Sequence, residues 1–335
     1  MTGALLRVDG LKKHYPVRTR LGRAASLRAV DGVSFSIEQG ETLSLVGESG
    51  CGKSTVGRAV LGLFPLTAGQ VSLEGRRIDN LNASAFRPVR KRLQVVFQDP
   101  FSSLNPRLRV RDIVAEPIGN FWPELGRADV ERRVVEVLDR VRLPRDAAGR
   151  WPHEFSGGQR QRIGIARALA AQPDLIVCDE AVSALDVSVK AQIVNLLQDL
   201  QDDLGLALLF ISHDLAVVEH MAHRVAVMYL GKIVELAPRS ALFAAPRHPY
   251  TKALLSAAPL VGRGAAAGQR IILNGDVPSP INPPKGCSFH TRCPFAFDRC
   301  RTEEPPLLRV GPDHLAACHL GDAAATSADN LPGRS

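Results

Sequence analysis

Short apolar runs alternate with amphipathic segments along most of this chain. Runs of strand length that are rich in Val, Leu and Ile occur at residues 5–8, 33–37, 42–46, 71–73, 93–97, 175–180 and 206–211. Between them lie segments of helical character at residues 54–63, 163–170 and 188–204, and the last of these carries its apolar side chains on one face. This order of strands and helices predicts an α/β fold in which helices pack on a buried sheet.

The pattern changes between about residue 104 and residue 159. There apolar residues recur at helical spacing, and charged residues fill the opposite face. The apolar positions are Val130, Val134, Val137, Leu138 and Val141. We interpret this segment as an amphipathic helical insert whose apolar stripe packs in a core. Earlier in the chain, residues 17–27 are basic, so we expect a surface loop between the first two strands.

The composition is that of a globular protein. The chain has 335 residues, of which 45% are hydrophobic and 23% are charged, a length that suggests about two domains. No apolar run approaches the roughly 18–20 residues that a transmembrane helix requires, and residues 1–15 lack the apolar core of a signal peptide. We therefore expect a cytoplasmic location. The net charge of +8 comes from scattered arginines and does not by itself indicate nucleic acid or a membrane surface as a partner.

Residues 47–55 have the form G-x-x-x-x-G-K-[ST] and lie between a predicted strand and a predicted helix, which is the context of a phosphate-binding loop. In such a loop the backbone N–H groups surround the β-phosphate, Lys53 reaches the β- and γ-phosphates, and the Ser54 hydroxyl can ligate Mg²⁺. The alternative, an ordinary glycine-rich turn, is disfavoured by this context. The residues expected to hold the nucleotide are Gly47, Ser49, Gly50, Cys51, Gly52, Lys53, Ser54 and Thr55.

Polar side chains follow three of the other predicted strands. Asp179 is placed to bind Mg²⁺ directly or through water, and Glu180 to orient or deprotonate the attacking water of a phosphoryl transfer. Gln98 is suited to reach the metal or its water, and His213 to contact the γ-phosphate at the carboxyl end of its strand. Taken singly, each of these residue types is also common in a solvated turn. Their shared position after strands favours a catalytic site.

Two further segments are weaker candidates. Ser156-Gly157-Gly158-Gln159 opens a predicted helix, where a hydroxyl and free backbone N–H groups face an anion, although the same residues also form a plain helix N-terminus. Tyr15 precedes the basic loop and is a candidate to stack on a base, and a half-buried strand tyrosine is an equally good interpretation.

Taken together, the phosphate loop, Gln98, the Ser-Gly-Gly-Gln segment, Asp179-Glu180, Ala184-Leu185-Asp186 and His213, in this order, resemble the ATPase subunit of ABC transporters over residues 1–236. The resemblance implies a P-loop ATPase core of ABC type with a helical subdomain at about 104–159. It also implies a head-to-tail dimer in which ATP and Mg²⁺ on one phosphate loop are covered by Ser156, Gly157 and Gly158 of the other subunit. By this resemblance Glu180 would be the general base, and Gln98 would contact the metal and the attacking water. Asp186 would act across the dimer interface, and Tyr15 would stack on adenine.

Three more segments resemble the dipeptide and oligopeptide importers, in the subunit type that pairs with a second, different ATPase. They are Phe97-Gln98-Asp99-Pro100 running into Ser103-Leu104-Asn105-Pro106, then Arg247-His248-Pro249-Tyr250-Thr251, then residues 278–284. The resemblance implies a C-terminal region of this transporter type at 237–335. It implies a heterodimer with a second ATPase subunit, two membrane permeases and an extracytoplasmic peptide-binding protein as partners, at the cytoplasmic face of the membrane.

Two other functions remain alternatives at this point. The same machinery could import nickel or another small solute, since the cargo is selected by other proteins. An ABC-type ATPase that acts on nucleic acid or the ribosome is disfavoured, because such proteins usually carry two ATPase units or a long coiled-coil insert. About a hundred residues without sustained heptads separate Thr55 from Ser156. We therefore expect no nucleic-acid partner.

Four of the six cysteines fall in one late, proline-rich segment, at Cys287, Cys293, Cys300 and Cys318. A cytoplasmic location favours thiols or metal ligands over disulfides. Zinc sites of four cysteines usually use paired C-x-x-C knuckles, whereas five and six residues separate the first three cysteines here. These residues, together with the resemblance to cysteine-bearing dipeptide ATPases, favour a structural 4Fe–4S cluster, with zinc and then free thiols as alternatives.

Overall fold

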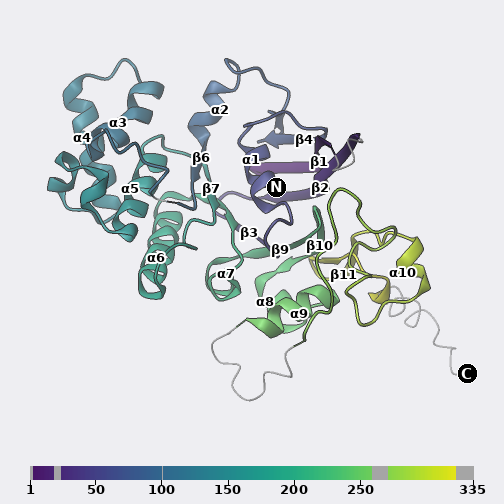
Figure 1. Cartoon of the computed structure of the whole chain (residues 1–335). Coiled ribbons are helices and arrows are strands. Elements are labelled where there is room, and N and C mark those ends of the chain that lie inside the picture. The colour runs from purple at the N-terminus through teal and green to yellow at the C-terminus, as the bar shows by residue number, and fades with distance from the viewer. Residues whose placement is uncertain (1–2, 19–23, 100, 259–270, 322–335) are drawn as a thin grey trace, which may run out of the picture.

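An eight-stranded sheet in the order β11-β12-β10-β9-β3-β8-β7-β6 crosses the structure (Figure 1). The computed structural model describes residues 3–18, 24–99, 101–258 and 271–321. The strands of this sheet are β3 Thr42–Val46, β6 Leu93–Val96, β7 Leu175–Asp179, β8 Ala207–Ile211, β9 Arg224–Tyr229, β10 Lys232–Pro238, β11 Leu308–Gly311 and β12 His314–Ala316. The five strands from β9 to β6 pair in parallel, so their carboxyl ends meet at one edge of the sheet.

Helices flank this sheet in the α/β arrangement that the sequence predicts. They are α1 Lys53–Val60, α2 Arg87–Arg92, α5 Gly157–Leu169, α6 Val187–Leu204, α7 Leu215–Met221, α8 Arg239–Ala244 and α9 Pro249–Ala257. The predicted helices at 54–63, 163–170 and 188–204 are confirmed as α1, α5 and α6, with ends that differ by at most six residues.

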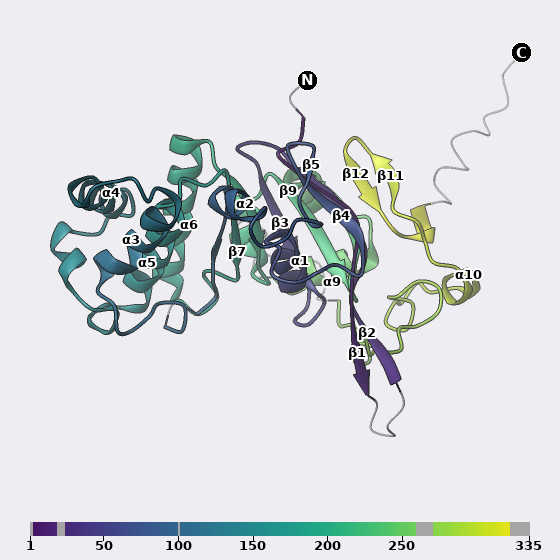
Figure 2. The ribbon, with the colours of Figure 1, turned by 90° about the horizontal axis from the view of Figure 1, so that it is seen from above.

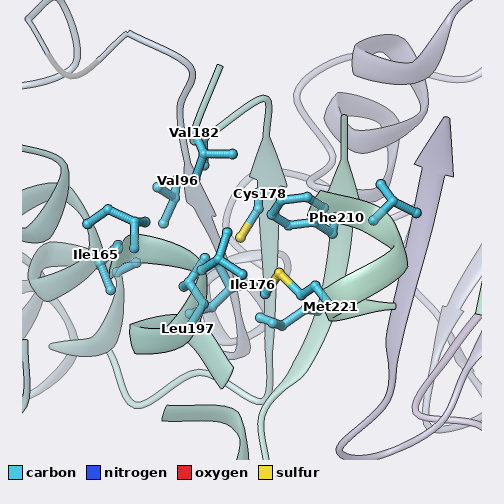
Figure 3. Packing of buried hydrophobic residues seen from close by; sticks show 14 of the residues in the cluster. Val96, Ile165, Ile176, Cys178, Val182, Leu197, Phe210 and Met221 are labelled. Carbon is cyan, nitrogen blue, oxygen red and sulfur yellow. The ribbon is translucent and has the colours of Figure 1, made fainter. Parts of the chain in front are cut away.

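The core on one side of the sheet is built by α5, α6 and α7 (Figure 3). Ile176, Cys178 and Phe210 of β7 and β8 pack there against Ile165 of α5 and Leu197 of α6, and all five side chains are buried. Cys178 is therefore a core residue, and burial raises the pKa of its thiol to about 12, so it stays protonated at neutral pH.

A second, antiparallel sheet has the order β2-β1-β4-β5. Its strands are β1 Leu6–Arg18, β2 Ala24–Ile37, β4 Ala68–Leu73 and β5 Arg76–Arg77. The expected surface loop at 17–27 is wrong at residues 17–18 and 24–27, because β1 and β2 pair there and the ladder runs from Leu6↔Ile37 out to Arg18↔Ala24; residues 19–23 of that loop lie outside the described residues. Backbone pairing between β1 and β2 extends the strands into a basic stretch that has no apolar pattern of its own. Figure 2 shows these two long paired strands.

The helical insert forms a subdomain beside the main sheet, at the left of Figures 1 and 2. It contains α3 Val110–Phe121, α4 Arg127–Arg140 and two 3₁₀ turns at Arg145–Gly149 and Pro152–Glu154. The predicted apolar stripe is confirmed, since Val134, Val137, Leu138 and Val141 are buried and Val130 packs against them. The stripe packs against α3 and α5, which belong to the same hydrophobic core.

The C-terminal region is tied into the main sheet. The expected domain boundary at 236 falls inside β10, and β12 pairs with β10 through Glu235↔Ala316 and Leu236↔Leu315. In the described part of this region, the regular elements after β10 are α8, α9, α10 (Asp298–Thr302), β11 and β12. Pro100, in the segment 97–100 that resembles peptide importers, lies outside the described residues. None of the helices described here is long and apolar enough to span a lipid bilayer.

Candidate nucleotide-binding site

The phosphate loop connects β3 to α1 and is pressed against two neighbouring segments. Gly52 has a φ of 106°, and a Cβ there would lie 2.2 Å from the carbonyl oxygen of Ala29 in β2. A Cβ on Gly47 would lie 2.3 Å from the carbonyl oxygen of Met228 in β9. Both contacts are far too short for a side chain, so glycine is required at both positions for the loop to close.

Lys53 occupies the centre of this loop. Its Nζ donates hydrogen bonds to the carbonyl oxygens of Gly47 at 2.8 Å and Glu48 at 3.0 Å. The residue is only 4% exposed, although it carries a charge. A buried ammonium held by backbone carbonyls inside a glycine-rich loop is prepared to meet phosphate oxygens.

Oxygen ligands for Mg²⁺ lie next to the loop. The Ser54 hydroxyl donates a hydrogen bond to Oδ1 of Asp179 at 2.6 Å, which joins the start of α1 to the end of β7. Hydroxyl and carboxylate oxygens are the ligands that Mg²⁺ prefers, so these two residues fit the ion. Gln98 is exposed two residues beyond β6, and β6 pairs with β7 through Val96↔Cys178, so Gln98 follows a strand that ends at the same edge.

Glu180 and His213 follow neighbouring strands. Asp179 pairs with Ile211 across β7 and β8. Just beyond these strand ends, Nδ1 of His213 lies 3.6 Å from Oε2 of Glu180. Glu180 has a positive φ of 52°, and its carbonyl oxygen accepts hydrogen bonds from the backbone N–H and the hydroxyl of Ser183. This turn points a general-base candidate at the edge where the phosphates are expected.

The Ser156–Gln159 segment opens α5, away from the phosphate loop in Figure 1. Ser156 Oγ accepts a hydrogen bond from the Gln159 N–H at 3.3 Å, and Gln159 Oε1 accepts one from the Ser156 N–H at 3.0 Å. This reciprocal cap is the plain helix N-terminus that the sequence left open. Ser156 and Gln159 are nevertheless exposed, and Gly158 is needed for packing because a Cβ there would lie 2.3 Å from Cγ1 of Val189.

Two other expected site residues lie at the surface. Asp186 precedes α6 and is exposed, and Val187 beside it is 84% exposed. Tyr15 lies on β1, where its ring meets Phe64 edge to face at a centroid distance of 6.2 Å, with Lys13 Nζ 4.9 Å from the ring centre. These contacts leave part of the Tyr15 ring exposed.

The four late cysteines gather in the C-terminal region as free thiols. The backbone N–H of Cys287 donates to the carbonyl oxygen of Cys300 at 2.9 Å. Burial, with the neighbouring Cys300, Cys318 and Cys293, raises the pKa of Cys287 to about 11. Across the described residues, however, no three or more His, Cys, Asp or Glu side chains are arranged to hold a metal ion, so the expected cluster site of Cys287, Cys293, Cys300 and Cys318 is not preformed.

Two residues that the sequence pattern did not identify as site residues also reach the phosphate loop. They are Tyr250 of α9 and Arg292 of the C-terminal region, and both contact Glu48. Tyr250 belongs to the segment at 247–251 that resembles peptide importers, and no local sequence pattern marks Arg292.

Comparison with known proteins agrees with this geometry. The family described as ABC transporter matches residues 30–183, and the oligopeptide/dipeptide transporter C-terminal region matches residues 234–300. The probable peptide ABC transporter ATP-binding protein y4tS of Sinorhizobium fredii is 55% identical over 329 residues, covering 98% of this chain and 93% of the relative. The oligopeptide transport ATP-binding protein AppF of Bacillus subtilis is 52% identical over 320 residues, covering 94% of this chain and 97% of the relative.

Solved structures of ABC cassettes share the fold. CbiO1 of Clostridium perfringens, part of the ABC transporter complex cbiONQ, has a TM-score of 0.63 and 26% identity, covering 72% of this chain and 91% of that one. The dimeric cassette MJ0796 bound to ADP and Pi also has a TM-score of 0.63 and 26% identity, covering 70% and 98%. The match of nearly the whole chain to peptide-transport relatives means that the protein belongs to the ABC transporter family, among its ATP-binding subunits with an oligopeptide/dipeptide transporter C-terminal region.

Proposed function

We propose that this chain binds MgATP at the phosphate loop and hydrolyses it to drive the import of dipeptides or oligopeptides through a membrane ABC transporter. The observation that carries the ATPase part is the convergence of Lys53, the Ser54–Asp179 pair and the Glu180–His213 pair. The peptide cargo is supported by the names of the relatives at over half identity and by the matched C-terminal region.

Within the chain, each residue has a separate task. Lys53 binds the β- and γ-phosphates, and Ser54, Asp179 and Gln98 hold Mg²⁺ or its water. The Glu180 carboxylate accepts the proton of the attacking water as the water oxygen bonds to the γ-phosphorus and the bond to the leaving ADP oxygen breaks. The remaining loop residues Gly47, Ser49, Gly50, Cys51, Gly52 and Thr55 surround the phosphates, and His213 contacts the γ-phosphate.

We infer that a second ATPase subunit completes the site. In this arrangement Ser156, Gly157, Gly158 and Gln159 of each subunit cover the ATP of the other, with Asp186 at the interface and Tyr15 against adenine. The exposure of Ser156 and Asp186 supports this inference, as does the dimeric state of the related MJ0796 cassette. A different ATPase as the partner, forming a heterodimer, follows from the resemblance to importers with two ATPases.

The other partners follow from the same family membership. They are two membrane permeases and an extracytoplasmic peptide-binding protein, and the chain works at the cytoplasmic face of the membrane. Nickel or another small solute is the alternative cargo. A 4Fe–4S cluster on the four late cysteines, with zinc as the alternative, is supported by their gathering in one region, where burial and neighbouring thiols raise the pKa values of Cys287, Cys293 and Cys318.

The direct test is reconstitution in liposomes with the permeases, the sister ATPase and the binding protein. We expect uptake of a radiolabelled dipeptide or oligopeptide only with ATP, and hydrolysis several times faster than with the chain alone. Uptake of Ni²⁺ but not of any peptide would move the cargo to the alternative class. Full hydrolysis by the isolated monomer would contradict the two-subunit site.

A further inference from the structure

The C-terminal region holds one residue of the phosphate loop from both sides. The backbone N–H of Glu48 donates a hydrogen bond to the hydroxyl of Tyr250 at 2.9 Å. The Glu48 carboxylate accepts two hydrogen bonds from the guanidinium of Arg292, at 2.7 Å from Nη1 and 3.1 Å from Nη2. A bidentate pair of this kind fixes orientation as well as charge.

Arg292 is itself held in a compact segment, which we call the cysteine loop and define as residues 287–293. The backbone N–H of Arg292 donates a hydrogen bond to the carbonyl oxygen of Phe289 at 3.0 Å. The buried Phe289 ring packs against the rings of Tyr229 and Tyr250 at centroid distances of 5.2 Å and 5.4 Å. The Arg292 side chain is only 8% exposed. The guanidinium is therefore aimed at the phosphate loop by a packed aromatic cluster.

The contact continues from Glu48 to the residue that meets the phosphates. The Glu48 carbonyl oxygen accepts a hydrogen bond from Lys53 Nζ at 3.0 Å. The Glu48 side chain, 29% exposed, also places a negative charge within a loop whose ligand is a highly charged anion. Unpaired, such a charge would repel the triphosphate, and Arg292 neutralises it.

We propose that Arg292 is a positioning residue for ATP binding: it fixes and neutralises Glu48, so that the affinity of the phosphate loop for ATP depends on the C-terminal region. The inference rests on the proposed ATPase function and adds to it a link between the cysteine loop and the nucleotide. No bond is made or broken in this role, and Arg292 does not touch the phosphates.

The test compares Arg292→Gln, Glu48→Gln and the double variant in the full chain. The readouts are the Kd for the fluorescent analogue TNP-ATP, and KM and kcat for ATP in the reconstituted transporter. Arg292→Gln leaves the Glu48 charge unpaired, so we expect Kd and KM to rise about tenfold while kcat at saturating ATP changes by less than about threefold. Glu48→Gln should cost much less affinity, and adding it to Arg292→Gln should recover most of the loss.

The unequal effects expected of Arg292→Gln and Glu48→Gln distinguish a role of Arg292 in ATP binding from a role in stabilising the fold. If the contact only stabilised the fold, Glu48→Gln and Arg292→Gln would weaken ATP binding equally, and the double variant would bind no more tightly than Arg292→Gln. Either result would overturn the inference. Arg292→Lys keeps the charge but loses the bidentate geometry, so its Kd should lie between those of the wild type and Arg292→Gln. It supplies the comparison if Arg292→Gln does not fold.

A matched control is available in the same region. Arg299→Gln breaks an exposed ion pair with Glu303, whose closest atoms are 2.8 Å apart, and should leave Kd and KM unchanged. The outcomes also separate the two proposals. If the wild type does not bind TNP-ATP, the proposed function fails, whereas a wild type that binds and variants that bind equally well would refute only the role of Arg292.

Discussion

The imidazole of His213 lies 3.6 Å from the carboxylate of Glu180, and each residue follows the carboxyl end of one of two adjacent parallel strands. The Glu180 side chain is 18% exposed and that of His213 is 57% exposed, so the carboxylate is the more buried of the two groups. This pairing places a proton acceptor and a second polar group together, as water attack on a phosphate requires.

The first prediction is that Glu180→Gln keeps ATP binding but lowers kcat by about 10²- to 10⁴-fold, because the amide can position water but cannot accept its proton. The measurement is steady-state ATPase activity with the complete transporter, together with TNP-ATP binding. An ATP-bound dimer should persist on gel filtration. Glu131→Gln, on the exposed face of α4, is the matched control. Hydrolysis by Glu180→Gln near the wild-type rate would remove Glu180 from the role of base.

The second prediction concerns binding itself. Lys53→Ala removes the ammonium at the centre of the phosphate loop, so ATP affinity should fall by about tenfold to a hundredfold, the expected loss for charge-assisted hydrogen bonds. Isothermal titration with MgATP measures it. Lys252→Ala removes an exposed lysine of α9 and should bind like the wild type. An unchanged affinity in Lys53→Ala would mean that the phosphates bind elsewhere.

The third prediction is a loss of stability in acid that comes from His248. This residue is 1% exposed, and burial lowers its pKa to about 4, partly opposed by the charge of Glu235. In the unfolded chain His248 takes up its proton near the ordinary pKa of about 6.5. Its contribution to the free energy of unfolding is therefore complete above pH 6.5 and is lost as the pH falls from there toward 4. At pH 5 the loss should be about 2 kcal/mol.

The variant that tests this is His248→Asn. His248 Nδ1 accepts a hydrogen bond from the Tyr250 N–H at the start of α9, and asparagine can accept the same bond without titrating. Urea unfolding should show that the free energy of unfolding falls less between pH 7 and pH 5 for the variant than for the wild type, whatever the stability of the variant at pH 7. Glu235 adds little in this range, because a carboxylate with a lowered pKa gives up its contribution only below about pH 4.5. Equal drops would exclude His248 as the source.

The fourth prediction concerns the late cysteines. Protein purified without oxygen should be brown, absorb broadly near roughly 400 nm and contain about four irons per chain. Cys300→Ser should lose the colour and the iron, whereas Cys178→Ala, in the core beside β8, should keep both. Colourless protein with one zinc per chain would favour the alternative metal, and protein without metal would leave the four thiols free, as they stand in the structure.

Much of the nucleotide site was readable from the sequence, because its parts are local. The spacing of the glycine-rich motif and its position between a strand and a helix predict Lys53 and Ser54 as ligands of the phosphates and Mg²⁺ without any tertiary information. Residues that directly follow buried parallel strands reach a common edge, which is why Asp179, Glu180 and His213 were predicted together and lie at the ends of adjacent strands. The apolar stripe of α4 was predictable for the same reason, since its helical period is written into consecutive residues.

Tertiary structure alone decided the contacts that join distant segments. Arg292 and Glu48 are 244 positions apart, and no local pattern marks either as the partner of the other. The long β1–β2 hairpin and the pairing of β12 with β10 likewise depend on backbone hydrogen bonds between strands, which leave little trace in residues that are basic or polar. Sequence spacing constrains neighbours along the chain, but which charge meets which across the fold depends on how the sheets and the aromatic cluster pack.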